Sequence, residues 1–323
     1  MTQQTPRYQP QPVTEIPRFA GIATFMRLPH VALEEAGDVD IGLIGVPWDG
    51  GTTNRPGPRH GPRQMRDASS MARLYHHVHR FSPFELANCA DLGDSPVNPV
   101  DVDDALKRIE AFYVDVVDRD IVPLTAGGDH LVSLPIMRAL GRNRTLGMIH
   151  FDAHTDLRDE NFGGFKFTHG TPFRRAIEDG VLDPKRTVQI GVRGAVFDFD
   201  DREFAKAKGL RIIDIEEALA LGPDEVMAQA RAIVGDQPIY VSFDIDCLDP
   251  AFAPGTGTPE IGGFTSREAQ FMLRGLRGLN IAGADVVEVS PPFDPSGHTA
   301  LAGMTMMYEL LCVMAERVGK QEG

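Results

Sequence analysis

The sequence predicts an α/β fold with three layers, in which helices cover both faces of a mostly parallel sheet of roughly eight strands. Two observations carry this prediction. Apolar runs of strand length alternate along the chain with segments of helical periodicity, which is the pattern of a parallel sheet covered by helices. No repeat or linker-like break interrupts this alternation after residue 40. We therefore expect an N-terminal arm over residues 1–38 and a single domain over residues 39–323.

Each element is predicted from its local pattern. Pro62 favours a helix start, because proline near the first turn lacks only an N–H that would be unpaired there. Acidic residues after Asp101 favour another start, and the spacing of Leu106 and Ile109 is helical. The expected strands cover 41–47, 123–128, 188–192, 212–215 and 284–289, and two more run from 146 and from 239 to 246. Three expected helices begin at 61, 102 and 131. Four others cover 171–177, 203–208, 266–276 and 300–318, and one more lies within 225–234.

The composition narrows the function classes. The 323 residues are 42% hydrophobic and 24% charged, and the formal net charge is −14. An acidic chain disfavours nucleic acids and anionic membranes as partners, since both require a basic face. The chain shows no secretory signal and no apolar run of about 18 residues that could span a bilayer. Its three cysteines (Cys89, Cys247 and Cys312) are widely spaced, which disfavours disulfides and thiolate zinc sites and fits a cytoplasmic protein.

A trio of metal-binding side chains follows the central apolar run. Asp152, His154 and Asp156 alternate directly after Ile149-His150-Phe151. In extended backbone, side chains two residues apart share a face, so the trio is expected to point the same way. The pattern predicts the end of a buried strand that opens onto a site.

Two further strand-like runs end in the same type of residue. His130 follows the run from 123, and Asp244 and Asp246 end the run from 239. In an open parallel sheet, ligands bind beyond the carboxyl ends of the strands, so one polynuclear metal site is expected there. Four carboxylates at this site would balance two divalent cations. Carboxylate and imidazole ligands without thiolate favour Mn²⁺, with Zn²⁺ and Ni²⁺ left open; a metal pair would activate a bound water at neutral pH.

The three clusters together resemble the signature motifs of the ureohydrolases, the arginase and agmatinase family. The resemblance extends over most of the chain from Gly45 onward. It implies a binuclear manganese enzyme that cleaves a guanidino group to an amine and urea by hydroxide attack on the guanidinium carbon. The matching segments are Gly127-Gly128-Asp129-His130, Asp152-Ala153-His154-Thr155-Asp156, Ser242-Phe243-Asp244-Ile245-Asp246-Cys247-Leu248-Asp249-Pro250, Arg55-Pro56-Gly57 and Glu288-Val289-Ser290-Pro291-Pro292.

The resemblance also implies roles for individual residues. His169 matches the histidine that shuttles a proton to the leaving amine, and Glu288 matches the carboxylate that receives the substrate guanidinium. Asp156 is expected to act in catalysis as well as in metal binding. A homo-oligomer, a trimer or a hexamer, is implied. One metal would be held by His130, Asp152, Asp156 and Asp244, and the other by Asp152, His154, Asp244 and Asp246.

The loop over 157–168 bears on the substrate. It lacks the Asn and Ser pattern by which arginases bind an α-amino acid, and the chain is more similar to the agmatinase branch. Within that branch it is most similar to hydrolases of guanidino acids such as 4-guanidinobutyrate and 3-guanidinopropionate. Candidate residues for the carboxylate tail are Lys166, Arg158, Asn161 and Asn54.

Other functions remain open at this point. Agmatine is the first alternative substrate, and small or alkylated guanidines and biguanides are others. A single-zinc deacetylase would share the fold type but would not need the full two-metal ligand set. A non-catalytic subunit of a hetero-oligomer would also fit the fold.

Overall fold

In the computed structural model, which describes residues 7–321, the backbone forms an eight-stranded sheet. Its strands are β1 (Ile41–Val46), β2 (Cys89–Asp94), β3 (Val122–Gly127), β4 (Leu146–Phe151), β5 (Leu182–Val192), β6 (Arg211–Asp214), β7 (Ile239–Asp244) and β8 (Ile281–Val287). Their order across the sheet is β2-β1-β3-β8-β7-β4-β5-β6, and every pairing is parallel. The predicted parallel sheet is confirmed.

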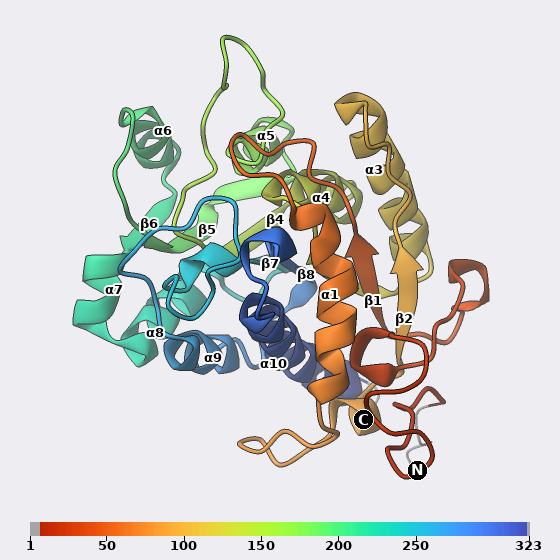
Figure 1. Cartoon of the computed structure of the whole chain (residues 1–323). Helices are drawn as coiled ribbons and strands as arrows, with labels where there is room; N and C mark the ends of the chain where they lie inside the picture. The colour runs from red at the N-terminus through yellow and green to blue at the C-terminus, as the bar shows by residue number, and fades with distance from the viewer. Residues whose placement is uncertain (1–6, 322–323) are drawn as a thin grey trace.

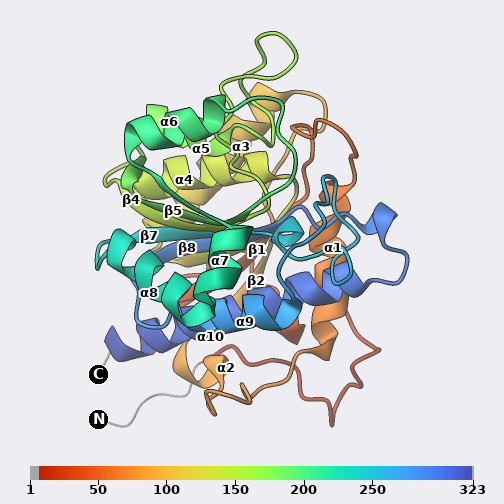
Figure 2. The same ribbon diagram turned by 90° about the vertical axis from the view of Figure 1, so that its left-hand side faces the viewer.

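Helices cover both faces of this sheet. They are α1 (Gly61–Ala68), α2 (Pro83–Leu86), α3 (Val102–Asp118), α4 (Ser133–Gly141), α5 (Pro172–Glu178), α6 (Asp200–Lys208), α7 (Ile215–Leu221), α8 (Pro223–Val234), α9 (Ser266–Arg274) and α10 (His298–Gln321). Helices α3 to α6 lie on one face, and α1 and α7 to α10 lie on the other (Figures 1 and 2). Each face buries its own hydrophobic core, so the three-layer architecture is confirmed.

Local signals set the helix ends. The Asp101 side chain accepts the N–H of Asp104 at the start of α3, and Thr265 forms a reciprocal capping box with Glu268 at the start of α9. Gly209 ends α6 in the left-handed conformation, with φ 79°. Short 3-10 helices lie at Phe25–Arg27, Leu33–Glu35, Pro58–His60, Ser69–Met71, His130–Val132, Ile245–Cys247 and Pro291–Phe293.

The sequence pattern does not reveal β2 or α7. Strand β2 lies at the edge of the sheet and pairs only with β1, and its residues Cys-Ala-Asp-Leu-Gly-Asp include no β-branched side chain. Helix α7 follows β6 without a loop, because Asp214 is both the last strand residue and the cap that accepts the N–H of Glu217. Such short elements give periodicity too few residues to show.

Residues 7–38 lie along the β2 edge of the sheet. Phe25 and Leu28 are buried. The Phe25 N–H donates to the Asp91 carboxylate over 2.9 Å, and the Val31 N–H donates to the Asp91 carbonyl. Residues 1–6 of the predicted arm and 322–323 of the predicted domain lie outside the described residues. The division into an arm and one domain stays a prediction.

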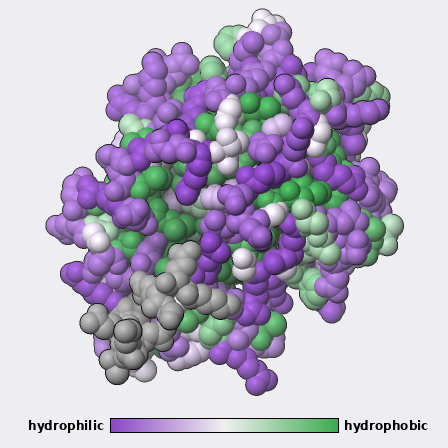
Figure 3. All heavy atoms as spheres, turned by 180° about the vertical axis from the view of Figure 1, so that it is seen from behind, coloured by the Kyte–Doolittle hydropathy of each residue, from purple (hydrophilic) through white to green (hydrophobic). Residues whose placement is uncertain are grey.

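The surface opposite to the view of Figure 1 is mostly hydrophilic, with hydrophobic atoms in separate patches (Figure 3). Cys89, Cys247 and Cys312 are buried and free. None of the helices within residues 7–321 combines the length and the apolar composition needed to cross a bilayer.

Candidate metal centre

Four neighbouring strands end at one place on the sheet. In the order β3-β8-β7-β4, His130 follows β3, Glu288 follows β8, Asp244 ends β7 and Asp152 follows β4. Because neighbouring parallel strands run in the same direction, their carboxyl ends meet at a single edge. The sheet therefore gathers residues that are far apart in the chain.

The imidazole of His130 faces three carboxylates through one nitrogen. Its Nδ1 lies 3.0 Å from Asp156 and 3.1 Å from both Asp152 and Asp244. A ring nitrogen carries at most one hydrogen, and none of the three contacts is a hydrogen bond of good geometry. Atoms bound to one octahedral cation at about 2.1 Å lie about 3.0 Å apart. The spacing is that of ligands around a shared cation.

A second imidazole adjoins the same cluster. His154 Nδ1 lies 3.2 Å from Asp246 Oδ2 and 3.4 Å from Asp152 Oδ1. Asp152 turns its other oxygen, Oδ2, toward His130, so its carboxylate lies between the two imidazoles. The structure thus brings together the six predicted metal ligands, namely His130, Asp152, His154, Asp156, Asp244 and Asp246, in an arrangement that could hold two cations.

The predicted extended geometry of the central trio is not what aligns these side chains. Strand β4 ends at Phe151, and the chain then turns, with Asp152 Oδ1 accepting the N–H of His154 over 2.6 Å. Asp156 lies in the left-handed region, with φ 50°. Asp244 accepts the N–H of Asp246 in the same way, over 2.8 Å. Carboxylate turns, rather than the pleat of a strand, converge the side chains.

The charges of the centre suit divalent cations. Burial raises the pKa of Asp244 well above its usual range, and the neighbouring Asp246 and Asp152 add to this shift. Burial opposes the charged form of His130, yet Asp152, Asp156 and Asp244 raise its pKa well above the usual value. Carboxylates this close cannot all ionise without compensation. Since the ligands are carboxylate and imidazole, Mn²⁺ or a similar divalent ion fits the site.

Glu288 and His169 line the cavity next to the ligand cluster. Glu288 has a left-handed φ of 63°, a strained conformation that is found at functional sites. Its Oε1 accepts the backbone N–H of His130 over 2.8 Å and lies 2.9 Å from His169 Nδ1. Its Oε2 is buried and has no hydrogen-bond partner among the described residues. That oxygen is therefore available to accept a hydrogen bond from a bound molecule.

His169 is placed between an acid and a hydroxyl. Burial opposes its charged form, but Glu288 outweighs this effect and raises the pKa of His169 to about 9. Its Nε2 lies 2.7 Å from the Thr53 hydroxyl, which can donate or accept, and 3.2 Å from the Thr53 N–H, which can only donate. The N–H favours the neutral ring and Glu288 favours the charged ring. His169 is therefore able to hold and release a proton.

A cavity of 570 Å³ opens onto these residues. Asn54, Arg158 and Asn161 line it, as do Asp156, His169 and Glu288, whereas Lys166 is exposed and does not line it. Arg158 is paired with Asp198 over 3.1 Å. The Asn161 side chain donates to the Thr168 hydroxyl. Of the predicted tail residues, three reach the cavity wall and one does not.

Sequence reasoning overlooks two residues here. His150 Nε2 lies 2.8 Å from Asp152 Oδ2, and the only signal in the sequence is the place of His150 near the end of the strand that Asp152 follows. Arg202 lines the cavity from α6. Its guanidinium has no carboxylate partner among the described residues. No local pattern distinguishes Arg202 from an ordinary helix-surface arginine.

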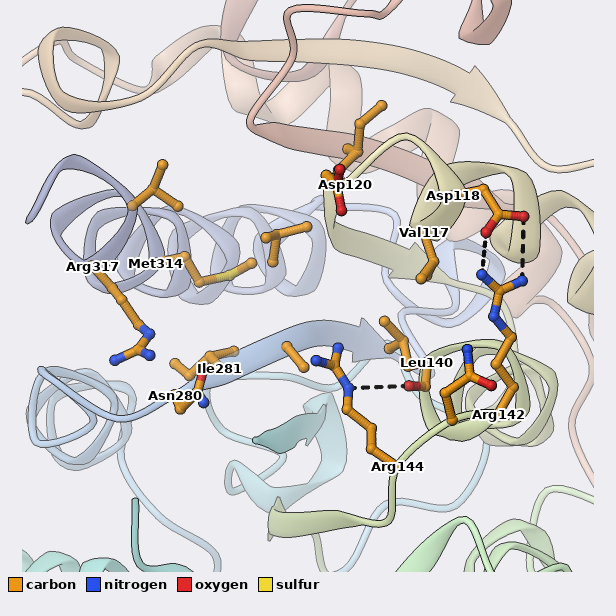
Figure 4. A pocket seen from close by; sticks show the side chains of 15 residues that line it. Val117, Asp118, Asp120, Leu140, Arg142, Arg144, Asn280, Ile281, Met314 and Arg317 are labelled. Carbon is orange, nitrogen blue, oxygen red and sulfur yellow. Dashed lines mark hydrogen bonds and ion pairs between the residues drawn. The ribbon is translucent and has the colours of Figure 1, made fainter. Parts of the chain in front are cut away.

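A second cavity lies at the opposite, amino edge of the sheet. It measures 530 Å³ and lies between α3, α4, β8 and α10 (Figure 4). Arg142 pairs there with Asp118, and Arg144 donates to the Leu140 carbonyl over 3.4 Å. The clusters of metal-ligating side chains found within residues 7–321 do not include any of its lining residues.

Known proteins resemble this chain over nearly its whole length. The model of the arginase family matches residues 39–313. A guanidinopropionase of Pseudomonas aeruginosa is 62% identical over 97% of this chain and 98% of its own, and a guanidinobutyrase of the same species is 46% identical over 95% and 97%. The structure of proclavaminate amidino hydrolase from Streptomyces clavuligerus superposes with a TM-score of 0.88, at 38% identity, over 93% of this chain and 99% of that chain.

Proposed function

This chain belongs to the arginase family and is a ureohydrolase acting on linear amidines, and on that basis we propose that it cleaves guanidino acids to an amino acid and urea. The relative at 62% identity is named a guanidinopropionase and the one at 46% a guanidinobutyrase. We therefore propose 3-guanidinopropionate as the first substrate and 4-guanidinobutyrate as the second.

The buried Oε2 of Glu288 carries the proposal. Because Oε1 already accepts from His130 and lies against His169, Oε2 is the oxygen left to accept an N–H of a guanidinium. A planar cation with several N–H donors matches a carboxylate in shape and charge. The substrate carbon would then lie beside the ligand cluster.

The chain's own residues supply binding and proton transfer. We assign His169 as the group that holds a proton and delivers it to the departing amine nitrogen, because Glu288 stabilises its charged form and the ring lines the cavity. When bound, two divalent cations, which we propose are Mn²⁺, would supply a water-derived nucleophile at neutral pH. The residues that would hold them are His130, Asp152, Asp156 and Asp244 for one cation and Asp152, His154, Asp244 and Asp246 for the other.

Arg202 is the side chain we assign to the carboxylate tail. It lines the cavity, and within residues 7–321 it has no carboxylate partner, whereas Arg158 is already paired with Asp198. Replacing Arg202 with alanine should raise KM for 3-guanidinopropionate about tenfold, the effect of one charge-assisted hydrogen bond. KM for methylguanidine, which has no tail, should not change. Equal effects on both substrates would contradict the assignment.

Agmatine is the alternative substrate, and one observation favours it. Its tail is a cation, and Glu260 also lines the cavity. Urea release from 3-guanidinopropionate, 4-guanidinobutyrate, agmatine, arginine, methylguanidine and a biguanide decides between them, with the Asp244→Ala variant as the blank. A clear preference for agmatine would overturn the guanidino-acid proposal. Urea release by the purified chain would exclude the role of a non-catalytic subunit.

Assembly and location are further parts of the proposal. Met71, Leu74, Tyr75 and Val78 are apolar and about half exposed on one short segment, which supports burial against another subunit. We propose a homo-oligomer, a trimer or a hexamer, which light scattering would identify. The free buried cysteines support a cytoplasmic location.

A further inference from the structure

We propose that Asp285 is a positioning residue that fixes which ring nitrogen of His130 carries the hydrogen, and so aims a bare Nδ1 at the cation. The inference rests on the proposed metal centre. It concerns a carboxylate that lies beneath the ligands, in β8, and touches neither substrate nor metal ligand.

Asp285 collects three hydroxyl groups in the core. It is fully buried, and its carboxylate accepts from Ser133 over 2.5 Å, from Tyr240 over 2.6 Å and from Ser242 over 2.7 Å. In all three contacts Asp285 is the acceptor. Because a hydroxyl has a single hydrogen, each of the three points that hydrogen at Asp285.

The direction of the Ser242 hydrogen bond determines which atom donates in the contact between Ser242 and His130. Ser242 Oγ lies 2.8 Å from His130 Nε2, and a hydroxyl has a single hydrogen. Since that hydrogen points to Asp285, Ser242 can only accept from the ring. In the neutral ring, which is the form that binds a cation, Nε2 therefore carries the hydrogen, and Nδ1 is left with its lone pair.

The bare nitrogen is the one that faces the carboxylates. Nδ1 lies 3.0 to 3.1 Å from Asp152, Asp156 and Asp244, where a lone pair against three acceptors is unfavourable without a cation. A partner that holds the distal N–H of a metal-binding histidine orients the ring and typically changes metal affinity 10- to 100-fold. Asp285 exerts this effect through Ser242 rather than directly.

The two imidazoles of the centre differ in this respect. Within residues 7–321, no side chain hydrogen-bonds the Nε2 of His154, which is one-third exposed. His130 is buried and is held by the Ser242–Asp285 relay. A change at Asp285 should therefore affect the cation at His130 and leave the cation at His154 as an internal reference.

The test uses Asp285→Asn with Tyr240→Phe as the matched control. An asparagine amide can donate to Ser242, which frees the serine hydrogen to turn toward His130 Nε2 and moves the ring hydrogen to Nδ1. Tyr240→Phe removes a hydroxyl from the same carboxylate but leaves the relay intact. Mn²⁺ is titrated into the metal-free proteins, with free Mn²⁺ followed by electron paramagnetic resonance. ¹⁵N NMR of the metal-free proteins, at a pH high enough that the His130 ring is neutral, reports which of its two nitrogens carries the hydrogen.

We expect Asp285→Asn to weaken one of the two Mn²⁺ ions 10- to 100-fold and to move the His130 hydrogen to Nδ1. Tyr240→Phe should change the affinity for Mn²⁺ by less than about threefold, which lies below the 10- to 100-fold range, and should leave the His130 hydrogen on Nε2. Ser242→Ala, which removes the relay without altering the carboxylate, should weaken the same single ion if Asp285→Asn folds poorly.

Two results would overturn the inference: Asp285→Asn that binds both ions like the wild type, or Tyr240→Phe that weakens binding as much as Asp285→Asn. The second would make Asp285 a structural residue only. The test also separates this inference from the proposed function. If Asp285→Asn weakens one Mn²⁺ ion as expected but the wild type releases no urea from any guanidino acid, the proposed function is contradicted and the positioning role is still supported.

Discussion

The two edges of the sheet carry cavities of nearly equal size and different chemistry. The cavity at the carboxyl edge measures 570 Å³ and the one at the amino edge 530 Å³. The first opens onto a group of buried carboxylates, among which burial and the neighbouring Asp246 and Asp152 raise the pKa of Asp244. In the second, Arg142 has a carboxylate partner and Arg144 a carbonyl partner. Buried carboxylates packed against one another, and not volume, distinguish the carboxyl edge from the amino edge.

Backbone direction explains the contrast. In a parallel α/β domain, the helices return toward the amino edge and end there, so this edge gathers the negative ends of helix dipoles. Arginines that follow α4 are expected there for stability alone. The carboxyl edge gathers loops, where carboxylates can turn inward toward a ligand.

Removing a proposed metal ligand at the carboxyl edge should give the largest effect. Asp244→Ala should abolish urea release, by more than about 100-fold, and lower the bound Mn²⁺, because direct ligands matter at least as much as the partners that orient them. Asp118→Ala at the amino edge is the matched control and should keep both. Atomic absorption and a urea assay measure the two outcomes. Normal metal content in Asp244→Ala would break the comparison.

His169, to which we assign proton transfer, should affect the rate of urea release and not metal binding. His169→Gln should lower kcat about 10² to 10⁴-fold, the usual contribution of general acid catalysis. Bound Mn²⁺ should stay at the wild-type level, since His169 contacts Glu288 and Thr53 and not the ligand cluster. If Mn²⁺ were lost as well, His169 would belong to the metal centre.

The pairing of His169 with Glu288 should make stability depend on pH. The pKa of His169 is raised from 6.5 to about 9, so its extra stability is fully present below pH 6.5 and is lost as the pH rises through 9. Urea unfolding of the metal-free wild type and of His169→Gln measures this. The wild type should lose up to about 3 kcal/mol relative to the variant over this range. If the free energies of unfolding of the wild type and of His169→Gln differed by the same amount at every pH in this range, the His169 ring would be neutral throughout.

The amino-edge cavity should tolerate change best. Arg144→Ala should leave kcat and KM within about twofold and lower the free energy of unfolding by less than about 1 kcal/mol, the usual worth of a cation at a helix end. Steady-state kinetics and thermal unfolding check this. A large loss of activity would show that the two edges are coupled, which would break the comparison from the other side.

Local sequence is a good guide wherever residues act within one strand and its turn. The predicted ligand trio of Asp152, His154 and Asp156 is recognised because an apolar run ends directly in residues of the types that bind metals. The same logic misses β2, whose edge position relaxes the demand for apolar residues, and it misjudges how the trio converges, because the turn at Asp152 replaces the expected strand. It also selects Lys166 as a candidate for the substrate tail, and this residue is exposed and does not line the cavity.

By itself, the sequence determines the fold class, the ligand types and the strand ends at which they lie. Only the tertiary structure decides that β3, β8, β7 and β4 are neighbours, and this order is what unites His130, Glu288, Asp244 and Asp152. It also decides that Asp285 reaches His130 through Ser242. The reason is physical: strand pairing and buried hydrogen bonds join residues more than a hundred positions apart, and local pattern contains no information on which distant group will satisfy a given donor.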